Sequence, residues 1–478
     1  MNYQMIRYTL GWVLNIESLC MLLPLVCSLI YNDGCTLVFS ACILLCFIIG
    51  TLLVCFRPKN KAVYAKEGFI IVALSWIIIS LFGALPFFLS GQIENFIDAV
   101  FETVSGFTTT GASILTDVEA LSPSLIFWRS FTHWIGGMGV LVFLIAVLPL
   151  AGGSNLHLIR AESTGPNVGK LVPKVKSTAK ILYLIYFGLT VSQITLMLIG
   201  KVPLFDALTI TFGTVGTGGF GIANSSIADY SSYIQSVVTV FMFLCGIDFS
   251  LYYLLLLRRF KDVFRSDELR AYVGIVVISV ILICINCKEI FPNFADGLKH
   301  SAFQVSSIMT TTGYTTVDYD AWPQFSKTIL VLLMFIGACA GSTGGGAKVS
   351  RILILLKSIV KEVKIAAHPK STHKIMMNGR IIEHETVRAV NVYMVSYLVI
   401  FLSSLLLISL DNQSFTTNFT AVAATINNIG PGLEAVGPTQ NFSLFSPLSK
   451  IVLIFDMLVG RLEIFPLLLL FSPFTWKK

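Results

Sequence analysis

The chain has 478 residues, of which 55% are hydrophobic and 12% are charged. A soluble domain carries about a quarter charged residues, so this composition excludes an ordinary soluble protein and indicates one that crosses a membrane several times. The net charge of +7 is compatible with a nucleic-acid partner, but orientation in a membrane explains the placement of the basic residues more simply, so no nucleic acid is expected.

The first 60 residues predict a transmembrane hairpin. Arg7 precedes a long apolar segment that ends near Ile30 without a small-residue cleavage motif, which favours a retained helix over a cleaved signal. Ten cysteines are scattered through apolar segments, a pattern more typical of buried inert thiols than of a metal or redox site.

Further spanning helices are predicted where apolar runs approach the roughly 20 residues that cross a bilayer. Clear examples are residues 69–89, 181–199, 272–287 and 390–410. Most of the 33 Lys and Arg residues fall at the chain ends or in residues 57–66, 160–180, 258–270 and 348–388. The alternate connections hold acidic residues, namely Asp98, Glu102, Asp117, Glu119, Asp318, Asp320 and Asp411. The positive-inside rule therefore predicts cytoplasmic basic loops and termini, with the acidic connections outside.

After the hairpin, four similar modules follow, at residues 61–158, 159–262, 263–365 and 366–478. Each has a spanning helix, a short apolar stretch, a segment rich in Gly, Thr or Asn, and a returning helix. These segments are "FTTTGAS" (107–113), "GTVGTGGFG" (213–221), "MTTTGYTT" (309–316) and "INNIGPG" (426–432). An ungapped comparison aligns Gly111, Gly219, Gly313 and Gly430, although Gly218 is a rival to Gly219.

The repeated segments predict a cation site. A short apolar stretch of about ten residues makes a helix of roughly 15 Å, half the hydrocarbon thickness, so it ends inside the membrane. Four such ends would aim partial negative charge at a common cavity, and glycine permits the positive φ that lets successive carbonyls face one ion. The expected oxygen donors are Thr110, Gly111, Gly218, Gly219, Thr312, Gly313, Ile429 and Gly430.

Two further features favour a gate. "GACAGSTGGGAKVS" interrupts the returning helix of the third module with five glycines: Gly337, Gly341, Gly344, Gly345 and Gly346. The stretch forms either a flexible loop in the pore or a passive kinked helix. Arg461 lies in the last spanning segment, where a buried arginine is costly and marks function, unless Asp456 and Glu463 simply neutralise it.

The chain resembles the Trk/Ktr/HKT superfamily of potassium transporters, and in particular its bacterial Trk-type membrane subunits. The resemblance rests on the Gly-rich segments and on "HWIGGMG" (133–139), "GACAGSTGGGAKVSRIL" (337–353) and "GRLEIF" (460–465). It implies an all-α polytopic protein of the bacterial inner membrane, with four M1–pore-loop–M2 repeats around a pseudo-fourfold pore. It also implies K⁺ as the transported ion, a homodimer, and a cytoplasmic nucleotide-binding ring of the TrkA type as regulator.

The same resemblance assigns the gate and the ion preference. It makes residues 337–350 an intramembrane gating loop and places Arg461 beneath the filter as part of the barrier. Glycine at all four filter positions implies K⁺ preference, since a serine in the first position accompanies Na⁺ transport in this superfamily. Two residues depart from the family pattern: Asp248 is a candidate cation site or arginine partner, and Glu434 adds charge outside the fourth segment.

Other functions remain as alternatives. A secondary carrier that couples K⁺ to Na⁺ or H⁺ is the main rival, although the four modules run parallel, whereas carriers favour inverted repeats. An enzyme is not expected, because no acid, base or metal-ligand cluster converges in the sequence. Gly216, Gly218 and Gly221 match a dinucleotide motif without its βαβ context, and Lys348 is displaced from a phosphate-loop position. No organic cofactor is therefore expected.

Overall fold

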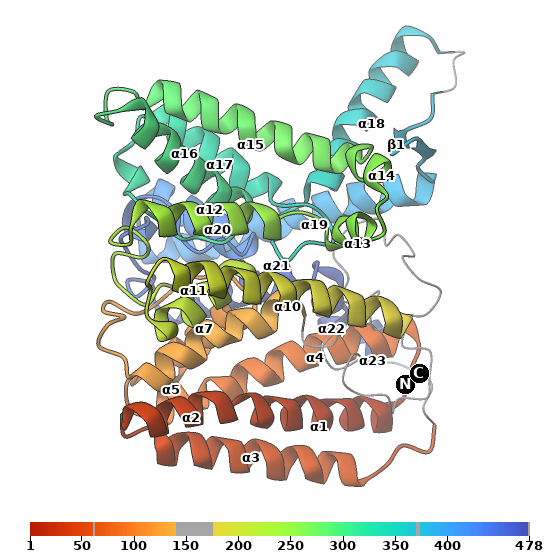
Figure 1. The fold of residues 1–478 in the computed structure, drawn as a ribbon. Helices are drawn as coiled ribbons and strands as arrows, with labels where there is room; N and C mark the ends of the chain where they lie inside the picture. The colour runs from red at the N-terminus through yellow and green to blue at the C-terminus, as the bar shows by residue number, and fades with distance from the viewer. Residues whose placement is uncertain (61–62, 140–174, 370–372, 477–478) are drawn as a thin grey trace.

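The computed structural model describes residues 1–60, 63–139, 175–369 and 373–476. In these ranges the chain is helical apart from short connections and a small antiparallel pair, β1 (Met376–Met377) and β2 (Arg380–Ile381). The predicted all-α fold is therefore confirmed. The long helices run side by side, and the two termini lie at the same end of the molecule (Figure 1).

Three helices occupy the first 60 residues, where the sequence predicts a transmembrane hairpin. They are α1 (Tyr3–Cys20), α2 (Leu22–Tyr31) and α3 (Thr36–Cys55). Close packing of α1 on α3 depends on two glycines, since a Cβ on Gly11 would lie 2.7 Å from the carbonyl oxygen of Gly50. Small residues commonly let membrane helices approach in this way.

The first two modules begin with long helices and continue with shorter ones. The first contains α4 (Ala65–Gly83), α5 (Leu85–Leu89), α6 (Phe96–Phe107) and α7 (Pro123–Gly137), and its residues 140–158 lie outside the described part. The second contains α10 (Val175–Ile199), α11 (Leu204–Val215), α12 (Ser232–Cys245), α13 (Phe249–Leu256) and α14 (Phe260–Phe264).

The last two modules repeat this order. The third contains α15 (Asp267–Asn286), α16 (Phe294–Met309), η1 (Tyr319–Ala321), α17 (Gln324–Ile336) and α18 (Val349–Ala367). The fourth contains β1, β2, α19 (His384–Ile408), η2 (Ser409–Asp411), α20 (Phe415–Ile426), η3 (Glu434–Val436), α21 (Pro447–Arg461), α22 (Phe465–Phe471) and α23 (Pro473–Trp476). The boundaries between modules stay a prediction.

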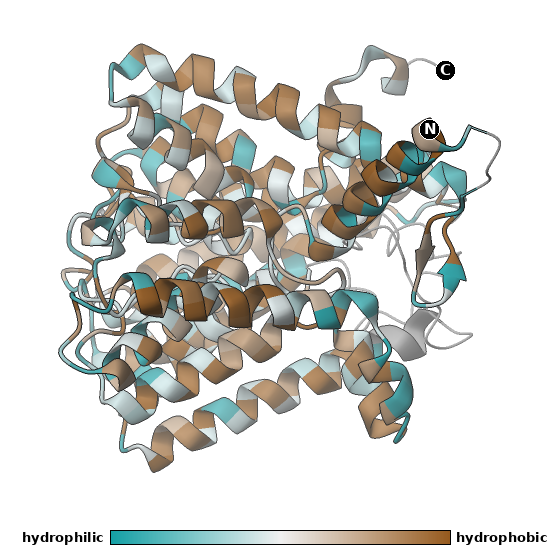
Figure 2. Ribbon diagram, turned by 90° about the horizontal axis from the view of Figure 1, so that it is seen from above, coloured by the Kyte–Doolittle hydropathy of each residue, from teal (hydrophilic) through white to brown (hydrophobic). Residues whose placement is uncertain are grey.

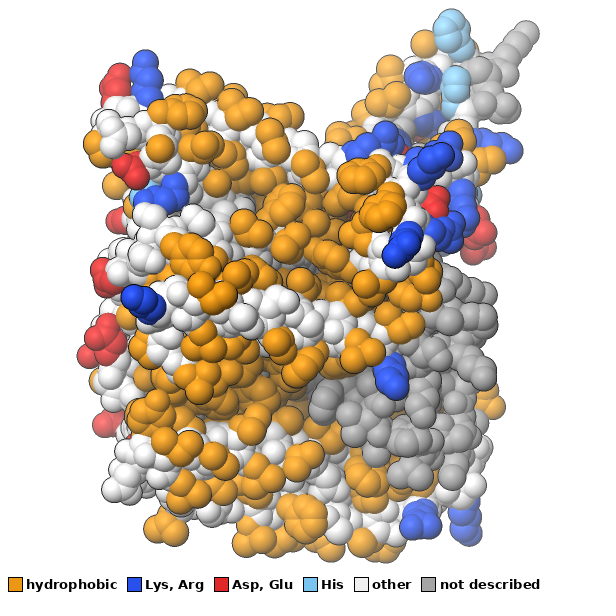
Figure 3. Space-filling model, in the orientation of Figure 1, with side chains coloured by type: hydrophobic (Ala, Val, Ile, Leu, Met, Phe, Trp, Pro, Cys, Tyr) orange, Lys and Arg blue, Asp and Glu red, His pale blue; other side chains and the backbone are white. Residues whose placement is uncertain are grey.

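The helices have the length and surface of a membrane protein. Among the described residues, six helices are long and apolar enough to cross a bilayer, and α12 with α13 would be a seventh although the pair is bent by 92°. Hydrophobic residues run along the helices, and hydrophilic ones gather near their ends (Figure 2). Acidic side chains follow one edge of the molecule, and most basic ones lie at the opposite edge (Figure 3), where the termini also lie. This separation matches the charge pattern of the sequence.

Candidate functional site

The four short helices α6, α11, α16 and α20 each end at a Gly-rich segment with the same backbone pattern. In every segment the aligned glycine and the residue two positions before it have positive φ, while the residue between them does not. The pairs are Thr109 (56°) and Gly111 (80°), Thr217 (55°) and Gly219 (75°), Thr311 (57°) and Gly313 (89°), and Asn428 (55°) and Gly430 (98°). This repetition settles the register in the second module in favour of Gly219 over Gly218.

The four segments contact one another in a closed ring. A Cβ on Gly111 would overlap the carbonyl of Gly218, one on Gly219 that of Thr312, and one on Gly313 that of Ile429. The ring closes at Gly430, whose Cβ would lie 2.8 Å from the carbonyl oxygen of Thr110. All eight residues predicted as oxygen donors therefore meet at one place, and glycine is required there because the carbonyl of the next segment occupies the space of a side chain.

The ring opens toward the acidic side through a pocket of about 140 Å³. Its lining includes the four aligned glycines and outer-loop residues such as Asn224 and Gln440. Among the described residues, no three or more His, Cys, Asp or Glu side chains gather in a metal-binding group. The ring offers backbone oxygens, which suit a monovalent cation better than a transition metal.

Buried hydroxyls and one amide hold the segments from behind. The hydroxyls of Thr108 and Thr110 lie 2.8 Å apart, and those of Thr310 and Thr312 repeat this contact at 2.8 Å. The side chain of Asn428 donates to the Thr110 hydroxyl (2.9 Å) and so links the fourth segment to the first. These contacts explain why threonines crowd beside the glycines.

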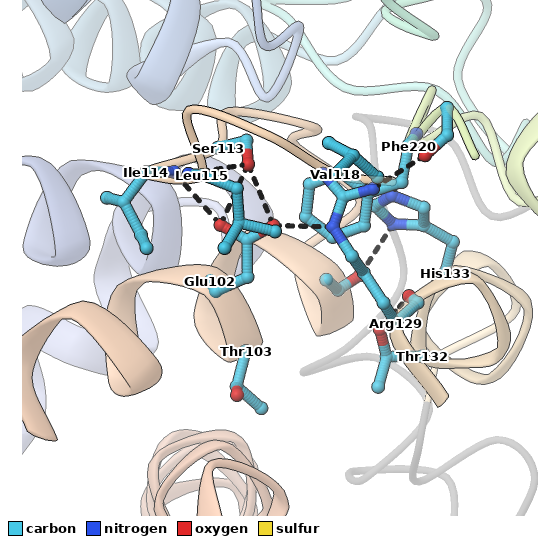
Figure 4. Close-up of polar contacts among 12 residues, drawn as sticks. Glu102, Thr103, Ser113, Ile114, Leu115, Val118, Arg129, Thr132, His133 and Phe220 are labelled. Atoms are coloured by element: carbon cyan, nitrogen blue, oxygen red, sulfur yellow. Dashed lines mark hydrogen bonds and ion pairs between the residues drawn. The ribbon is translucent and has the colours of Figure 1, made fainter. Parts of the chain in front are cut away.

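A buried ion pair lies behind the first two segments (Figure 4), and the sequence did not predict it. Glu102 was expected in an acidic outer connection, but it is 1% exposed within α6 and accepts from Arg129 Nε at 2.5 Å. The expectation was wrong because it followed sequence position, whereas the side chain turns inward to a partner on α7. Its carboxylate also accepts from the Ser113 hydroxyl (3.0 Å) and the Ile114 amide (3.0 Å).

His133 lies one turn after Arg129 on α7. Its Nδ1 lies 2.8 Å from the Gly106 carbonyl oxygen, and its Nε2 accepts from the Phe220 amide at 3.3 Å. A carbonyl only accepts and an amide only donates, so these partners fix the tautomer with the proton on Nδ1. His133 is therefore packed and hydrogen-bonded, and its partners place it in the support of the first two segments.

The Gly-rich stretch of the third module is a loop beneath the ring. Residues 337–348 are not helical between α17 and α18, and Gly337, Gly341 and Gly346 have positive φ. The alternative of a passive kinked helix is therefore wrong. The amide of Gly345 donates to the Thr311 hydroxyl (2.6 Å), and the amide of Gly346 donates to the Asn427 carbonyl (3.1 Å). The loop thus contacts the third and fourth segments directly.

Side chains from two helices hold this loop. Arg461 of α21 donates to the Thr343 carbonyl in the loop (2.9 Å), and it also donates to the carbonyls of Gly136 and Gly137 at the end of α7. Glu268 of α15 accepts from the amide of Ala340 in the loop (2.7 Å) and from that of Ser350 in the first turn of α18 (3.1 Å). Arg461 was expected from the sequence but Glu268 was not, because Glu268 lies in the first turn of α15, 72 residues before Ala340.

The two carboxylates near Arg461 in sequence have other partners. Asp456 accepts from the Ser404 hydroxyl at 2.7 Å, and Glu463 pairs with Arg351. Arg351 also stacks on the Tyr393 ring, with its guanidinium carbon 3.9 Å from the ring centroid. Arg461 itself contacts the loop at the Thr343 carbonyl and the end of α7 at the carbonyls of Gly136 and Gly137.

The two residues that depart from the family pattern have local roles. Asp248 caps α13 by accepting from the Ser250 amide (2.8 Å), and a Cβ on Gly341 would lie 2.6 Å from its carboxylate. Glu434 accepts from the hydroxyls of Ser414 and Thr417 outside the fourth segment, and the Ser414 hydrogen bond lowers the pKa of Glu434 from its ordinary value.

Comparisons with known proteins agree with this architecture. The family described as TrkH, cation transport protein, matches residues 36–478. The chain is 36% identical to the Trk system potassium uptake proteins TrkH of Salmonella typhimurium and of Escherichia coli K12, over the full length of each pair. The crystal structure of the potassium transporter TrkH from Vibrio parahaemolyticus superposes with a TM-score of 0.89, at 32% identity and with both chains fully covered. The chain therefore belongs to the TrkH family of cation transport proteins.

Proposed function

We propose that this chain takes up K⁺ across the cell membrane through a gated, K⁺-selective pore formed by four repeats around a pseudo-fourfold axis. The closed ring of Gly-rich segments carries the proposal, because a ring of carbonyl oxygens replaces the water shell of a dehydrated monovalent cation. The oxygens assigned to this filter belong to Thr110, Gly111, Gly218, Gly219, Thr312, Gly313, Ile429 and Gly430. Their mutual contacts and the pocket that reaches the four glycines support the assignment.

The loop beneath the ring is the proposed gate. Gly341, Gly344, Gly345 and Gly346 allow its backbone to pass directly under the third and fourth segments, and Arg461 together with Glu268 holds it there. Opening requires these contacts to break, so the barrier on the basic side is a movable part of the chain. Transport of K⁺ needs no organic cofactor and no enzymatic step in this scheme.

The basic end is the proposed cytoplasmic side of a bacterial inner membrane. The charge separation and the placement of both termini support this orientation (Figures 1 and 3). The chain forms a homodimer in this proposal, and a cytoplasmic nucleotide-binding ring of the TrkA type docks on the basic end and regulates the gate. Support for the docking face is α18, which extends beyond the neighbouring helices at that end (Figure 1) and carries Lys357, Lys361 and Lys364.

Two measurements test this function. A host that lacks its own K⁺ uptake should grow at limiting K⁺ when it expresses the chain, and no rescue by a folded, membrane-inserted protein would overturn the proposal. Purified protein in planar bilayers should then show unitary K⁺ currents at fixed gradients. A fixed stoichiometry of K⁺ with Na⁺ or H⁺, without unitary currents, would instead identify a coupled carrier.

A further inference from the structure

The ion pair between Glu102 and Arg129 connects the first two Gly-rich segments at matching positions (Figure 4). Glu102 accepts from Ser113 and Ile114, which follow Gly111 by two and three residues. Arg129 donates from Nη1 to the carbonyl of Gly221 at 2.8 Å, two residues after Gly219. One pair of charges therefore fixes both segments just beyond their aligned glycines.

Arg129 also fixes the aromatic residue between these points. Its guanidinium carbon lies 3.5 Å from the centroid of the Phe220 ring, and His133 packs on the same ring at a centroid distance of 4.2 Å. The guanidinium is planar and presents its donors in a rigid fork. The bond from Nε to Glu102 and the bond from Nη1 to the Gly221 carbonyl therefore share one fixed geometry, and a shift of that carbonyl would disturb both. The geometry of the second segment is thereby coupled to that of the first.

The other three repeats lack this pair. In the register that aligns the four glycines, the positions equivalent to Glu102 are Ile210, Gln304 and Ala421. Neutral groups support the third and fourth segments instead: the Ser307 hydroxyl donates to the Tyr314 carbonyl at 2.6 Å, and the Leu433 amide donates to the Thr420 hydroxyl at 3.0 Å. A short helix that ends at a Gly-rich segment therefore folds without a charge at this position.

Burial makes the pair costly. The side chain of Glu102 is fully buried and that of Arg129 is 3% exposed. Removing two charges from water costs several kcal/mol each, so a buried pair is weak evidence of stabilisation, and its best attested use is to fix one arrangement among several. A charged pair at one of four equivalent positions fits such a use.

We propose that the Glu102–Arg129 pair is a specificity-determining positioning device, which sets the spacing of the carbonyls in the first two segments and so the preference for K⁺ over Na⁺. The inference rests on the proposed filter function and adds the groups that tune it. Neither side chain coordinates the ion. The pair acts through the Ser113 hydroxyl and the backbone of Ile114 and Gly221.

Two variants separate geometry from charge. Arg129→Lys keeps the positive charge but loses the fork that reaches Gly221, so the K⁺/Na⁺ permeability ratio should fall at least tenfold while K⁺ still passes. Glu102→Gln keeps an oxygen for the Ile114 amide but leaves Arg129 uncompensated near the ion path, so flux of both cations should fall as well. The permeability ratio is measured from reversal potentials of the full-length protein in bilayers with K⁺ and Na⁺ on opposite sides.

The matched control is another ion pair on the same helix. Lys450 of α21 donates to Asp98 of α6 at 2.6 Å, one turn before Glu102. Lys450→Gln removes an ion pair of similar length that makes no contact with the Gly-rich segments among the described residues, so its permeability ratio should stay within twofold of the unmodified protein.

The outcomes of these measurements distinguish a failure of the proposed filter function from a failure of the role assigned to the Glu102–Arg129 pair. If the unmodified protein carries no K⁺, the filter function itself is wrong and the inference falls with it. If the unmodified protein prefers K⁺ and folded Arg129→Lys keeps the same ratio, only the inference is wrong. If both variants at the pair fail to fold while Lys450→Gln folds, the pair serves the scaffold, and the assigned role in ion preference is overturned.

Discussion

Arg461→Ala should raise the basal flux of K⁺ without changing the ion preference. Arg461 contributes one hydrogen bond to the loop itself, from Nη1 to the Thr343 carbonyl at 2.9 Å, while its other described bonds join α7. A hydrogen bond that involves a charged group contributes about 1.5–3 kcal/mol. At 1.4 kcal/mol for each tenfold change, loss of this bond shifts the closed–open equilibrium of the loop by about tenfold to about 150-fold. None of these described bonds reaches a Gly-rich segment of the ring, so the K⁺/Na⁺ ratio should stay the same.

The assay is cation flux into proteoliposomes that contain equal amounts of correctly folded protein. Arg461→Lys retains the charge but has a single donor group, so its flux should lie between those of the native protein and the alanine variant. Arg259→Ala is the matched control, because Arg259 pairs with Asp262 on the surface, with 60% of its side chain exposed, and its flux should not change. An unaltered leak in folded Arg461→Ala, or a changed K⁺/Na⁺ ratio, would refute the reasoning.

Three further predictions follow from the ring and the loop. Gly219→Ala should bring the K⁺/Na⁺ permeability ratio close to one, because the added Cβ would overlap the Thr312 carbonyl and a φ of 75° is strained for alanine. The control is Gly188→Ala on α10, which has open space around it. This variant should leave the ratio unchanged and stabilise the helix by about 1 kcal/mol. Glu268→Ala should raise basal flux more than Glu268→Gln, since the amide oxygen of glutamine still accepts from the amides of Ala340 in the loop and Ser350 in α18. Equal flux of these two variants in proteoliposomes would contradict this mechanism. Exchange of KCl for NaCl at constant ionic strength should lower the free energy of unfolding, by about 2.7 kcal/mol when K⁺ is at a hundred times its dissociation constant. Identical thermal unfolding curves in the two salts would argue against a selective ring.

The repeated elements could be predicted because they are local in sequence. The predicted spans at 69–89, 181–199, 272–287 and 390–410 fall on long apolar helices. The short helices are 12 to 16 residues long, somewhat longer than the expected ten or so, and each ends within the first three residues of its Gly-rich segment. Apolar runs predict the helices and glycine clusters predict the breaks between them, because both features depend on residues close together in the sequence.

The register of the second segment needed the backbone. "GTGGFG" offers two adjacent glycines, and composition alone does not tell which one aligns with Gly111. The signal is the residue two positions earlier, because the positive φ of Thr217 pairs with Gly219, as that of Thr109 pairs with Gly111. A threonine with positive φ is uncommon, so this conformation could not be predicted from the sequence.

Contacts between distant helices could not be predicted. Glu102 and Arg129 are 27 residues apart, and Glu268 is 72 residues from Ala340, so no helical or strand periodicity brings either pair together. The available signal for Glu102 was its mismatch with Ile210, Gln304 and Ala421 at equivalent positions. A charge that appears in one of four repeats, inside a short apolar helix, indicates a buried partner rather than an outer acidic surface.

The position of the loop bears on the choice between a pore and a carrier. A Cβ on Gly344 would lie 2.8 Å from the Thr310 carbonyl oxygen, and one on Gly345 would overlap the Asn427 carbonyl, so glycine lets the loop pass against the base of the third and fourth segments. The glycines of the ring line a pocket on the other side, where no described loop comes between them and the pocket. A carrier that alternates access needs a barrier on each side of its site, and closes one as it opens the other. A barrier on the basic side is the arrangement expected of a gated pore, so the position of the loop favours the proposed pore over a carrier.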